Sequence, residues 1–249
     1  MIKYDIQDEI GILTLNRPEK RNALHPEMVG QMKMKLNEVR DENSVKVLII
    51  TGSGSAFCAG ADLEYLNELK DYSSIQNEKD SRDLADLFLM IYEFPKLVIA
   101  AVNGAAIAGG CGLASVCDLI VAEEANSKFG YSEVKIGFVP AIVSAFLIRR
   151  IGEGMAKQLL LSGEIINAQR AYEIGLVNYI ENNALIGALN VASKLKTNSL
   201  LSMRMMKSMT NKVGYLPVSD AIEYGIVLNT ISRSTEDFKN GLKNFLEKK

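Results

Sequence analysis

The stretch Ala106-Ile107-Ala108-Gly109-Gly110-Cys111-Gly112-Leu113 decides the fold of this chain. It follows Leu97–Val102, an apolar run of strand length that ends at Asn103-Gly104. Within and beyond it, Gly110–Cys117 has the small and apolar composition of a buried helix. A buried strand joined to a buried helix through a glycine-rich turn indicates α/β organisation.

The same stretch has the properties of an anion-binding turn. Glycine lets a ligand approach the backbone closely, and the first N–H groups of a helix lie unpaired at its positive dipole end. The N–H of Gly109 is therefore a candidate donor to a developing oxyanion. A turn that serves only for tight packing would use the same residues, so this segment alone leaves both interpretations open.

A second segment upstream follows the same pattern. Val47–Thr51 is a buried strand that ends at Gly52–Ser55. Cys58–Ala61 then leads into a helix that carries Asp62 in its first turn. We expect the Asp62 side chain to cap that helix. The N–H of Ala61 is a second candidate donor, and two donors that converge from two strand ends would form an oxyanion hole.

Four motifs occur in an order and at a spacing that resemble the crotonase, or enoyl-CoA hydratase/isomerase, superfamily. They are Leu15–Leu24, Ala56–Leu63, Ala101–Asp118 and Phe129–Pro140. The resemblance covers essentially the whole chain and implies an α/β fold, a crotonase-like spiral of ββα turns with a C-terminal helical region. We expect the spiral core over residues 1–190 and a helical oligomerisation region over residues 191–249, although the sequence itself shows no repeat.

The resemblance also implies a set of functional residues. The carbonyl of an acyl-CoA thioester would lie between the N–H groups of Ala61 and Gly109, with Glu133 as the catalytic carboxylate. A second glutamate, usual in hydratases of this family, would fall at Gly112 and is missing. The implied substrate-binding residues are Lys20, Arg21, Ala23, Ala59, Asp62, Leu63, Gly110 and Pro140.

Lys20 and Arg21 carry the positive charge that would neutralise the phosphates of coenzyme A. A solvated basic turn explains each side chain equally well.

With Glu133 as the only family carboxylate, three functions stay open. A hydratase acting on a 2-enoyl-CoA would use Glu133 both to activate water and to return the proton, and this function is favoured. A double-bond isomerase would use it to move a proton between C2 and C4, and a non-catalytic homologue would only bind acyl-CoA. Glu133–Ser144 differs from the Gly-rich stretch that follows the glutamate in many short-chain hydratases, and it resembles the methylglutaconyl-CoA hydratases of leucine degradation. The resemblance to the family places the enzyme in fatty acid metabolism or leucine degradation.

Composition excludes several other classes of function. The 249 residues are 48% hydrophobic, which is enough for a large core. The net charge of −2 lacks the excess of positive charge that is typical of nucleic-acid-binding proteins. No apolar run reaches membrane-spanning length, and Met1–Asp5 leads straight into a strand, which predicts no signal peptide. We therefore expect a cytoplasmic protein that binds neither membrane nor nucleic acid and assembles, by resemblance, as a homotrimer or homohexamer.

The sequence predicts no metal site and no cofactor, because coenzyme A would be part of the substrate. The cysteines Cys58, Cys111 and Cys117 have no zinc spacing and fit buried free thiols. The single histidine, His25, precedes Pro26 at a predicted helix start, which favours a capping role over catalysis.

The remaining pattern predicts the secondary structure that surrounds these motifs. Ile2–Ile6 and Gly11–Leu15 form a strand pair, and a helix from Pro26 buries one apolar face. Lys70–Asp83 is polar and is interpreted as a linker between helices. Further helices and one short strand are expected at Ile142–Ile151, Gly154–Leu161, Ala168–Ile174, Val177–Ile180 (strand), Ala184–Leu195, Leu200–Asn211, Val218–Ser232 and Thr235–Glu247, the last capped by Ser234 with Asp237.

Overall fold

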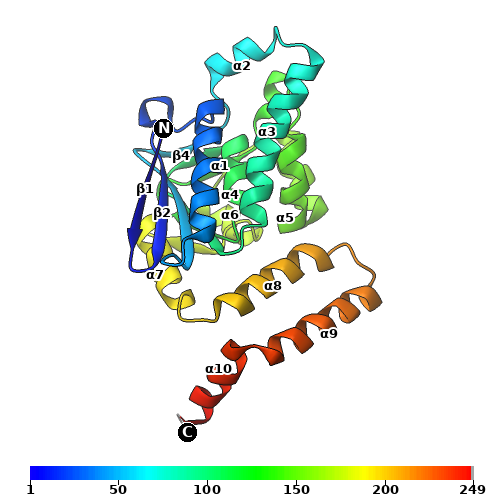
Figure 1. The fold of residues 1–249 in the computed structure, drawn as a ribbon. Helices are drawn as coiled ribbons and strands as arrows, with labels where there is room; N and C mark the ends of the chain where they lie inside the picture. The colour runs from blue at the N-terminus through cyan, green and yellow to red at the C-terminus, as the bar shows by residue number, and fades with distance from the viewer. Residues whose placement is uncertain (248–249) are drawn as a thin grey trace. The chain divides into compact units, whose positions relative to one another are not determined.

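The computed structural model describes residues 1–247. The chain divides into two compact units, Met1–Lys194 and Leu195–Lys249. The first runs from blue to yellow in Figure 1 and the second from orange to red. Both sheets that residues 1–247 form lie in the first unit, which is the part that positions the candidate site.

Two sheets form the framework of the first unit. The six-stranded sheet has the order β1 (Ile2–Gln7), β2 (Ile10–Leu15), β3 (Val47–Gly52), β5 (Leu97–Val102), β7 (Leu119–Glu123) and β10 (Tyr179–Glu181). The four-stranded sheet has the order β4 (Ala56–Cys58), β6 (Ala105–Ile107), β8 (Lys128–Gly130) and β9 (Ile165–Asn167). Neighbours pair in parallel except for β1 with β2 and β8 with β9.

The order of these strands along the chain is that of a spiral. Each of β3, β5 and β7 is followed within a few residues by a strand of the smaller sheet, β4, β6 and β8 respectively, and then by helix. The expected fold of repeated ββα turns is confirmed. β3 and β5 are apolar along nearly their whole length because a parallel strand is covered on both faces.

The helices that cover the sheets agree with the apolar periodicity. α1 (Pro26–Asp41) buries Met28, Met32, Leu36 and Val39 in the main core. α7 (Ala184–Leu195) packs Ala184, Ala188 and Ala192 against β3, β5 and β7, in a second core cluster on the other face of the large sheet. Small alanine side chains at that spacing allow the helix to approach the sheet closely.

Two helices meet the site from the downstream segments. α4 (Gly109–Ser115) is buried along its length after its first residue. α5 (Ala141–Ser162) contains a break at Gly152, whose φ of 78° is not helical. The two helices expected there are confirmed as the helical segments on either side of this kink. α6 (Ala168–Glu173) follows β9.

Two expectations for the secondary structure of the first unit are wrong in detail. The polar segment Lys70–Asp83 is mostly helix, because α2 (Leu63–Leu69) is followed directly by α3 (Ser74–Tyr92). Ser73 and Gln76 form a reciprocal capping box at the start of α3. The short strand expected at Val177–Ile180 lies at β10, two residues further on.

The second unit contains α8 (Leu200–Val213), α9 (Val218–Ser234) and α10 (Glu236–Glu247), and none of these helices has a fully buried residue. Thr235, rather than the expected Ser234, accepts the N–H of Phe238 at the start of α10, at 3.2 Å. Ser234 instead donates to the carbonyl of Ile231 in α9. Among residues 1–247, no helix combines the length and the apolarity needed to cross a membrane.

Candidate active site

A cavity of about 1080 Å³ lies in the first unit, between the segments that carry the predicted motifs. Its walls come from the start of α1, from residues 59–72, from the first half of α3, from the turn before α4 and from residues 132–143. Ala61, Gly109 and Glu133 all line it. The fold thus brings the three residues predicted to be catalytic, from three separate motifs, to one cavity.

The N–H of Gly109 is available because of how α4 begins. Ala108 has a φ of 53° and a ψ of −125°, so the chain turns sharply before the helix starts at Gly109. The first N–H of a helix has no acceptor within the helix, and the N–H of Gly109 has none elsewhere in residues 1–247. Gly109 lines the cavity at the positive end of this helix.

The second donor is brought close by a glycine. Gly60 has a φ of 94°, and a Cβ there would lie 2.9 Å from the carbonyl oxygen of Ile107 and 3.6 Å from the nitrogen of Gly109. Only glycine tolerates both the positive φ and this close approach. Ala61 follows directly, so its backbone lies beside the start of α4.

The backbone around Ala61 is held by hydrogen bonds on both sides. Leu24 donates its N–H to the carbonyl of Gly60 at 2.7 Å and accepts the N–H of Asp62 at 2.9 Å. These bonds pair Leu24 with Ala61 as an isolated parallel bridge. The N–H of Ala61 itself has no acceptor among residues 1–247, so both proposed donors are free to bind a substrate oxygen.

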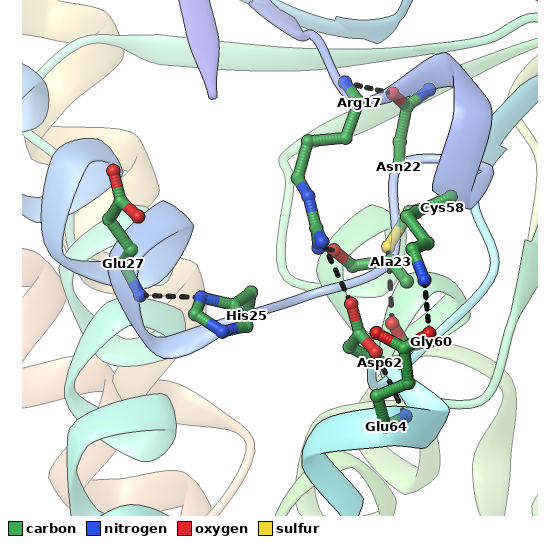
Figure 2. A network of polar contacts seen from close by, with 10 residues as sticks. Arg17, Asn22, Ala23, His25, Glu27, Cys58, Gly60, Asp62 and Glu64 are labelled. Atoms are coloured by element: carbon green, nitrogen blue, oxygen red, sulfur yellow. Dashed lines mark hydrogen bonds and ion pairs between the residues drawn. The ribbon is translucent and has the colours of Figure 1, made fainter.

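A buried ion pair anchors the same segment, as Figure 2 shows. Arg17 contacts the carboxylate of Asp62 at 2.8 Å and donates to the carbonyl of Ala23 at 2.9 Å. Burial opposes ionisation of Asp62, but hydrogen bonds from Arg17 and from the N–H of Glu64 outweigh it and lower the Asp62 pKa below its ordinary value. Asp62 also caps α2 as expected, accepting the N–H of Glu64 at 3.0 Å.

Asn22 fixes the other end of this loop. Its side-chain nitrogen donates to the carbonyls of Ser53 and Ala56, and its side-chain oxygen accepts the N–H of Arg17. The side chain is completely buried. Hydrogen bonds from the Leu15–Leu24 motif therefore hold the loop before β4 in place. Through Arg17, the same motif also contacts the segment that carries Ala61.

Glu133 places a buried carboxyl oxygen at the site. It begins the short helix η2 (Glu133–Ile136), and only 8% of its surface is exposed. Its Oε2 atom is buried without a hydrogen-bond partner in the described chain. Burial raises the pKa of this carboxyl above its ordinary value, which suits a group that takes up and returns a proton.

Gly112 has no room for a side chain. A Cβ at this position would lie 2.2 Å from Cγ1 of Val143, 3.0 Å from its Cβ and 3.3 Å from Cε2 of Phe88. The missing second glutamate therefore leaves no empty space behind, because apolar side chains fill the position.

The predicted substrate-binding residues fall into two groups. Ala59, Leu63 and Pro140 line the cavity together with the catalytic set. The others are outside its walls: Lys20, Arg21, Ala23, Asp62 and Gly110.

Each residue of the second group has an evident structural environment. Lys20 pairs with Glu64 at 2.6 Å, and Arg21 is exposed in a left-handed turn with a φ of 49°. Ala23 and Gly110 are buried, and a Cβ at Gly110 would lie 2.0 Å from the carbonyl oxygen of Cys58. Gly110 is thus required for close packing of α4 on β4.

Several cavity residues escaped the sequence analysis, among them Tyr65, Gln76, Lys79 and Phe138. Two of them lie in the segment interpreted as a linker, so the error there hid part of the wall. The Ser73–Gln76 capping box was a sequence signal that would have placed α3 correctly.

His25 caps α1 as expected, accepting the N–H of Glu27 on Nδ1 at 3.3 Å. It also lines the cavity, edge-on to Tyr65 with 5.8 Å between ring centroids. The three cysteines are buried and free, as predicted.

Comparison with known proteins identifies the family to which this chain belongs. The family model described as enoyl-CoA hydratase/isomerase matches residues 5–249. The chain belongs to the enoyl-CoA hydratase/isomerase family. It is 37% identical to a 2,3-dehydroadipyl-CoA hydratase of Escherichia coli, over 98% of this chain and 94% of that protein. It is 35% identical to a crotonyl-CoA hydratase of Syntrophomonas wolfei, over 98% and 94% respectively.

Solved structures of the family have the same fold. An enoyl-CoA hydratase from a Polaromonas species superimposes with a TM-score of 0.95 at 31% identity, covering 100% of this chain and 97% of that one. The resemblance to the crotonase superfamily and its spiral fold is confirmed, and the protein is an enzyme of the hydratase/isomerase family.

Proposed function

We propose that this enzyme adds water across the C2–C3 double bond of a 2-enoyl-CoA thioester. The observation that carries the proposal is the convergence on one cavity of two backbone N–H groups without acceptors, at Ala61 and Gly109, and of the buried carboxyl of Glu133. The names of relatives that hydrate enoyl-CoA thioesters support the same reaction.

The mechanism follows from the three groups. The thioester oxygen accepts hydrogen bonds from Ala61 and Gly109, which stabilises the negative charge that develops on it as the C2–C3 π bond is polarised. The Glu133 carboxylate takes a proton from water while the water oxygen forms its bond to C3. Glu133 then returns that proton to C2 as the enolate collapses, so one carboxyl serves as base and then as acid.

The substrate's coenzyme A would be held outside the catalytic cavity. Lys20 and Arg21 lie beyond the cavity walls, on the loop that contacts the donor segment, and supply positive charge for phosphates. Binding there would require Lys20 to exchange Glu64 for a phosphate. The proposal needs neither metal nor cofactor, because coenzyme A enters as part of the substrate.

A second reaction is favoured by a specific observation, the packed apolar site at Gly112. A single carboxyl that can reach both C2 and C4 would shift a double bond without adding water. Product analysis on 2-enoyl, 3-enoyl and 3-methylglutaconyl thioesters separates the possibilities. Hydration of 2-enoyl thioesters supports our proposal, conversion of only the 3-enoyl thioester supports isomerisation, and binding without turnover of any thioester supports a non-catalytic homologue.

The same panel tests the narrower proposals. Preferred turnover of 3-methylglutaconyl-CoA would support the leucine-degradation subgroup suggested by Glu133–Ser144. We further propose that the enzyme assembles as a homotrimer or homohexamer through its C-terminal helices. The cytoplasmic location stays a prediction, which cell fractionation would check.

A further inference from the structure

Val143 separates the cavity from the buried face of α4. It lies near the start of α5, is 4% exposed and lines the cavity. Gly112 lies beneath it, is buried and does not line the cavity. The 2.2 Å between Cγ1 of Val143 and an ideal Cβ on Gly112 shows that this valine occupies the space a side chain on α4 would otherwise fill.

The position of Val143 follows from that of Gly112. Gly109 and Gly112 are three residues apart on α4, so they share one face of the helix, with about 5–6 Å between their side-chain positions. Val143 therefore packs one helical turn away from the proposed Gly109 donor. An acyl group whose carbonyl oxygen binds that donor, with C2 and C3 beside Glu133, has Val143 as its neighbour.

Two aromatic side chains pack near Val143. Phe88 of α3 is completely buried and lies 3.3 Å from the ideal Cβ of Gly112. Phe146, one helical turn after Val143 on α5, packs edge-to-face on Phe88, with 6.4 Å between ring centroids. On the side that faces Gly112, Val143 therefore forms the cavity wall.

We propose that Val143 is a specificity-determining residue that limits the size of the acyl group next to Glu133, so that the enzyme favours short acyl chains. The inference rests on the proposed function, because it places the thioester carbonyl at Gly109. Removing the two γ-methyl groups opens space bounded by Gly112 and Phe88, whereas lengthening the side chain closes the cavity further.

The test compares Val143→Ala and Val143→Leu with the wild type. The matched control is Val116→Ala, which removes the same two methyl groups from a buried residue at the end of α4 that does not line the cavity. One measurement is the ratio of kcat/KM for 2-octenoyl-CoA to that for 2-butenoyl-CoA. A second is the corresponding ratio of dissociation constants for saturated octanoyl-CoA and butanoyl-CoA.

We expect Val143→Ala to shift the kcat/KM ratio toward the longer thioester by about tenfold, the scale of one or two methylenes in an apolar pocket. Val143→Leu should shift it the other way, and Val116→Ala should leave it unchanged. Unchanged ratios in both folded Val143 variants, or equal shifts in the Val116 control, would overturn the inference.

Thermal unfolding establishes which variants are folded, and Val143→Leu decides the case if Val143→Ala does not fold. If the wild type hydrates no thioester, the proposed function fails on its own. The dissociation constants then decide the role of Val143: a shifted ratio supports it and an unshifted ratio refutes it.

Discussion

Glu133 combines burial, a carboxyl oxygen without a partner and a place in the cavity wall, and no other acidic residue among those described does so. Replacing it with Gln keeps the shape and removes the transferable proton. We expect turnover to fall by about 10²- to 10⁴-fold, with acyl-CoA binding retained. Steady-state hydration assays and calorimetric binding of a saturated acyl-CoA measure the two effects.

The control is Glu153→Gln, at an exposed glutamate of α5 that pairs with Lys157 on the same helix. Its activity should equal that of the wild type. Near-normal turnover in Glu133→Gln would show that another group carries the proton.

Glu133 also links stability to pH. Burial raises its pKa in the folded state, so between the unfolded and the folded pKa the folded state binds more protons. Stability then decreases as pH rises through that window, and the cost of the buried charge is fully present above it. Chemical denaturation at several pH values should show Glu133→Gln gaining stability over the wild type from acid toward neutral pH. A stability difference that does not vary with pH would contradict this.

Activity should change with pH in the direction opposite to stability, rising as the pH rises. The base form of Glu133 is the ionised one, so kcat/KM should fall as pH drops through the raised pKa. The acid limb of the pH–rate profile should therefore lie above the ordinary range of glutamate. A limb within that range would show that the free enzyme does not hold Glu133 in an apolar environment.

How much of the site was visible in the sequence differs from residue to residue. Gly109, Ala61 and Glu133 each lie within a motif that resembles the crotonase superfamily, and that resemblance implied their convergence. Val143 carried no such signal, because its partner Gly112 is far away in sequence and the contact exists only once α5 packs on α4. The structural duty of Gly110 was hidden for the same reason, since Cys58 approaches it from another strand.

At the scale of elements, the proposed mechanism depends on the backbone N–H of Gly109 at the start of α4. Gly109→Pro removes one N–H, and proline is tolerated at the first position of a helix. Loss of one oxyanion donor should lower kcat by about 10²- to 10³-fold. Circular dichroism and thermal unfolding verify the fold.

The companion variant Gly109→Ala keeps the N–H and adds a Cβ that would lie 3.3 Å from Leu24. Its loss of activity should be clearly smaller than that of the proline variant. Equal losses in both would attribute the effect to crowding rather than to the hydrogen bond.

The loop that carries Ala61 depends on the Arg17–Asp62 ion pair, whose side chains are 12% and 5% exposed. Arg17→Ala leaves a buried carboxylate without its partner, which costs about 3–5 kcal/mol of unfolding free energy. Because the pKa of Asp62 is lowered in the fold, this loss should be full at neutral pH and shrink as pH falls through that pKa. Urea unfolding of the wild type and of Arg17→Ala, at neutral pH and at a pH below the Asp62 pKa, measures this loss of stability.

Arg82→Ala provides the contrast, because Arg82 and Glu78 form an exposed pair on α3. Its effect on the free energy of unfolding should be much smaller than that of Arg17→Ala, because solvent screens an exposed ion pair. If both arginine variants cost the same, the Arg17 pair does not hold the loop.

The elements themselves were largely predictable, and the errors have physical causes. Periodic apolar faces predicted α1, α7 and the C-terminal helices, because each buries or presents a continuous stripe. The first turns of α3 are exposed and polar, so Lys70–Asp83 showed no apolar face and was mistaken for a linker. Local hydrogen bonding by Ser73 and Gln76, rather than burial, starts that helix.

At the scale of the whole molecule, the helices of the second unit expose apolar surface. The helices α8, α9 and α10 contain no fully buried residue, yet they carry many large apolar side chains. On α10, Phe238, Leu242 and Phe245 are 44%, 48% and 64% exposed. Their spacing of four and three residues places them on one face of the helix, which is the pattern of a surface that packs against another chain.

We therefore expect light scattering to give a mass three or six times that of one chain. Replacing Leu242 and Phe245 together with Glu places charge in the apolar face and should shift the enzyme toward smaller species. Asn240→Glu adds charge on the opposite side of α10 and should leave the assembly intact. A monomeric wild type would refute the oligomer, and an unchanged mass in the Leu242/Phe245 variant would place the interface elsewhere.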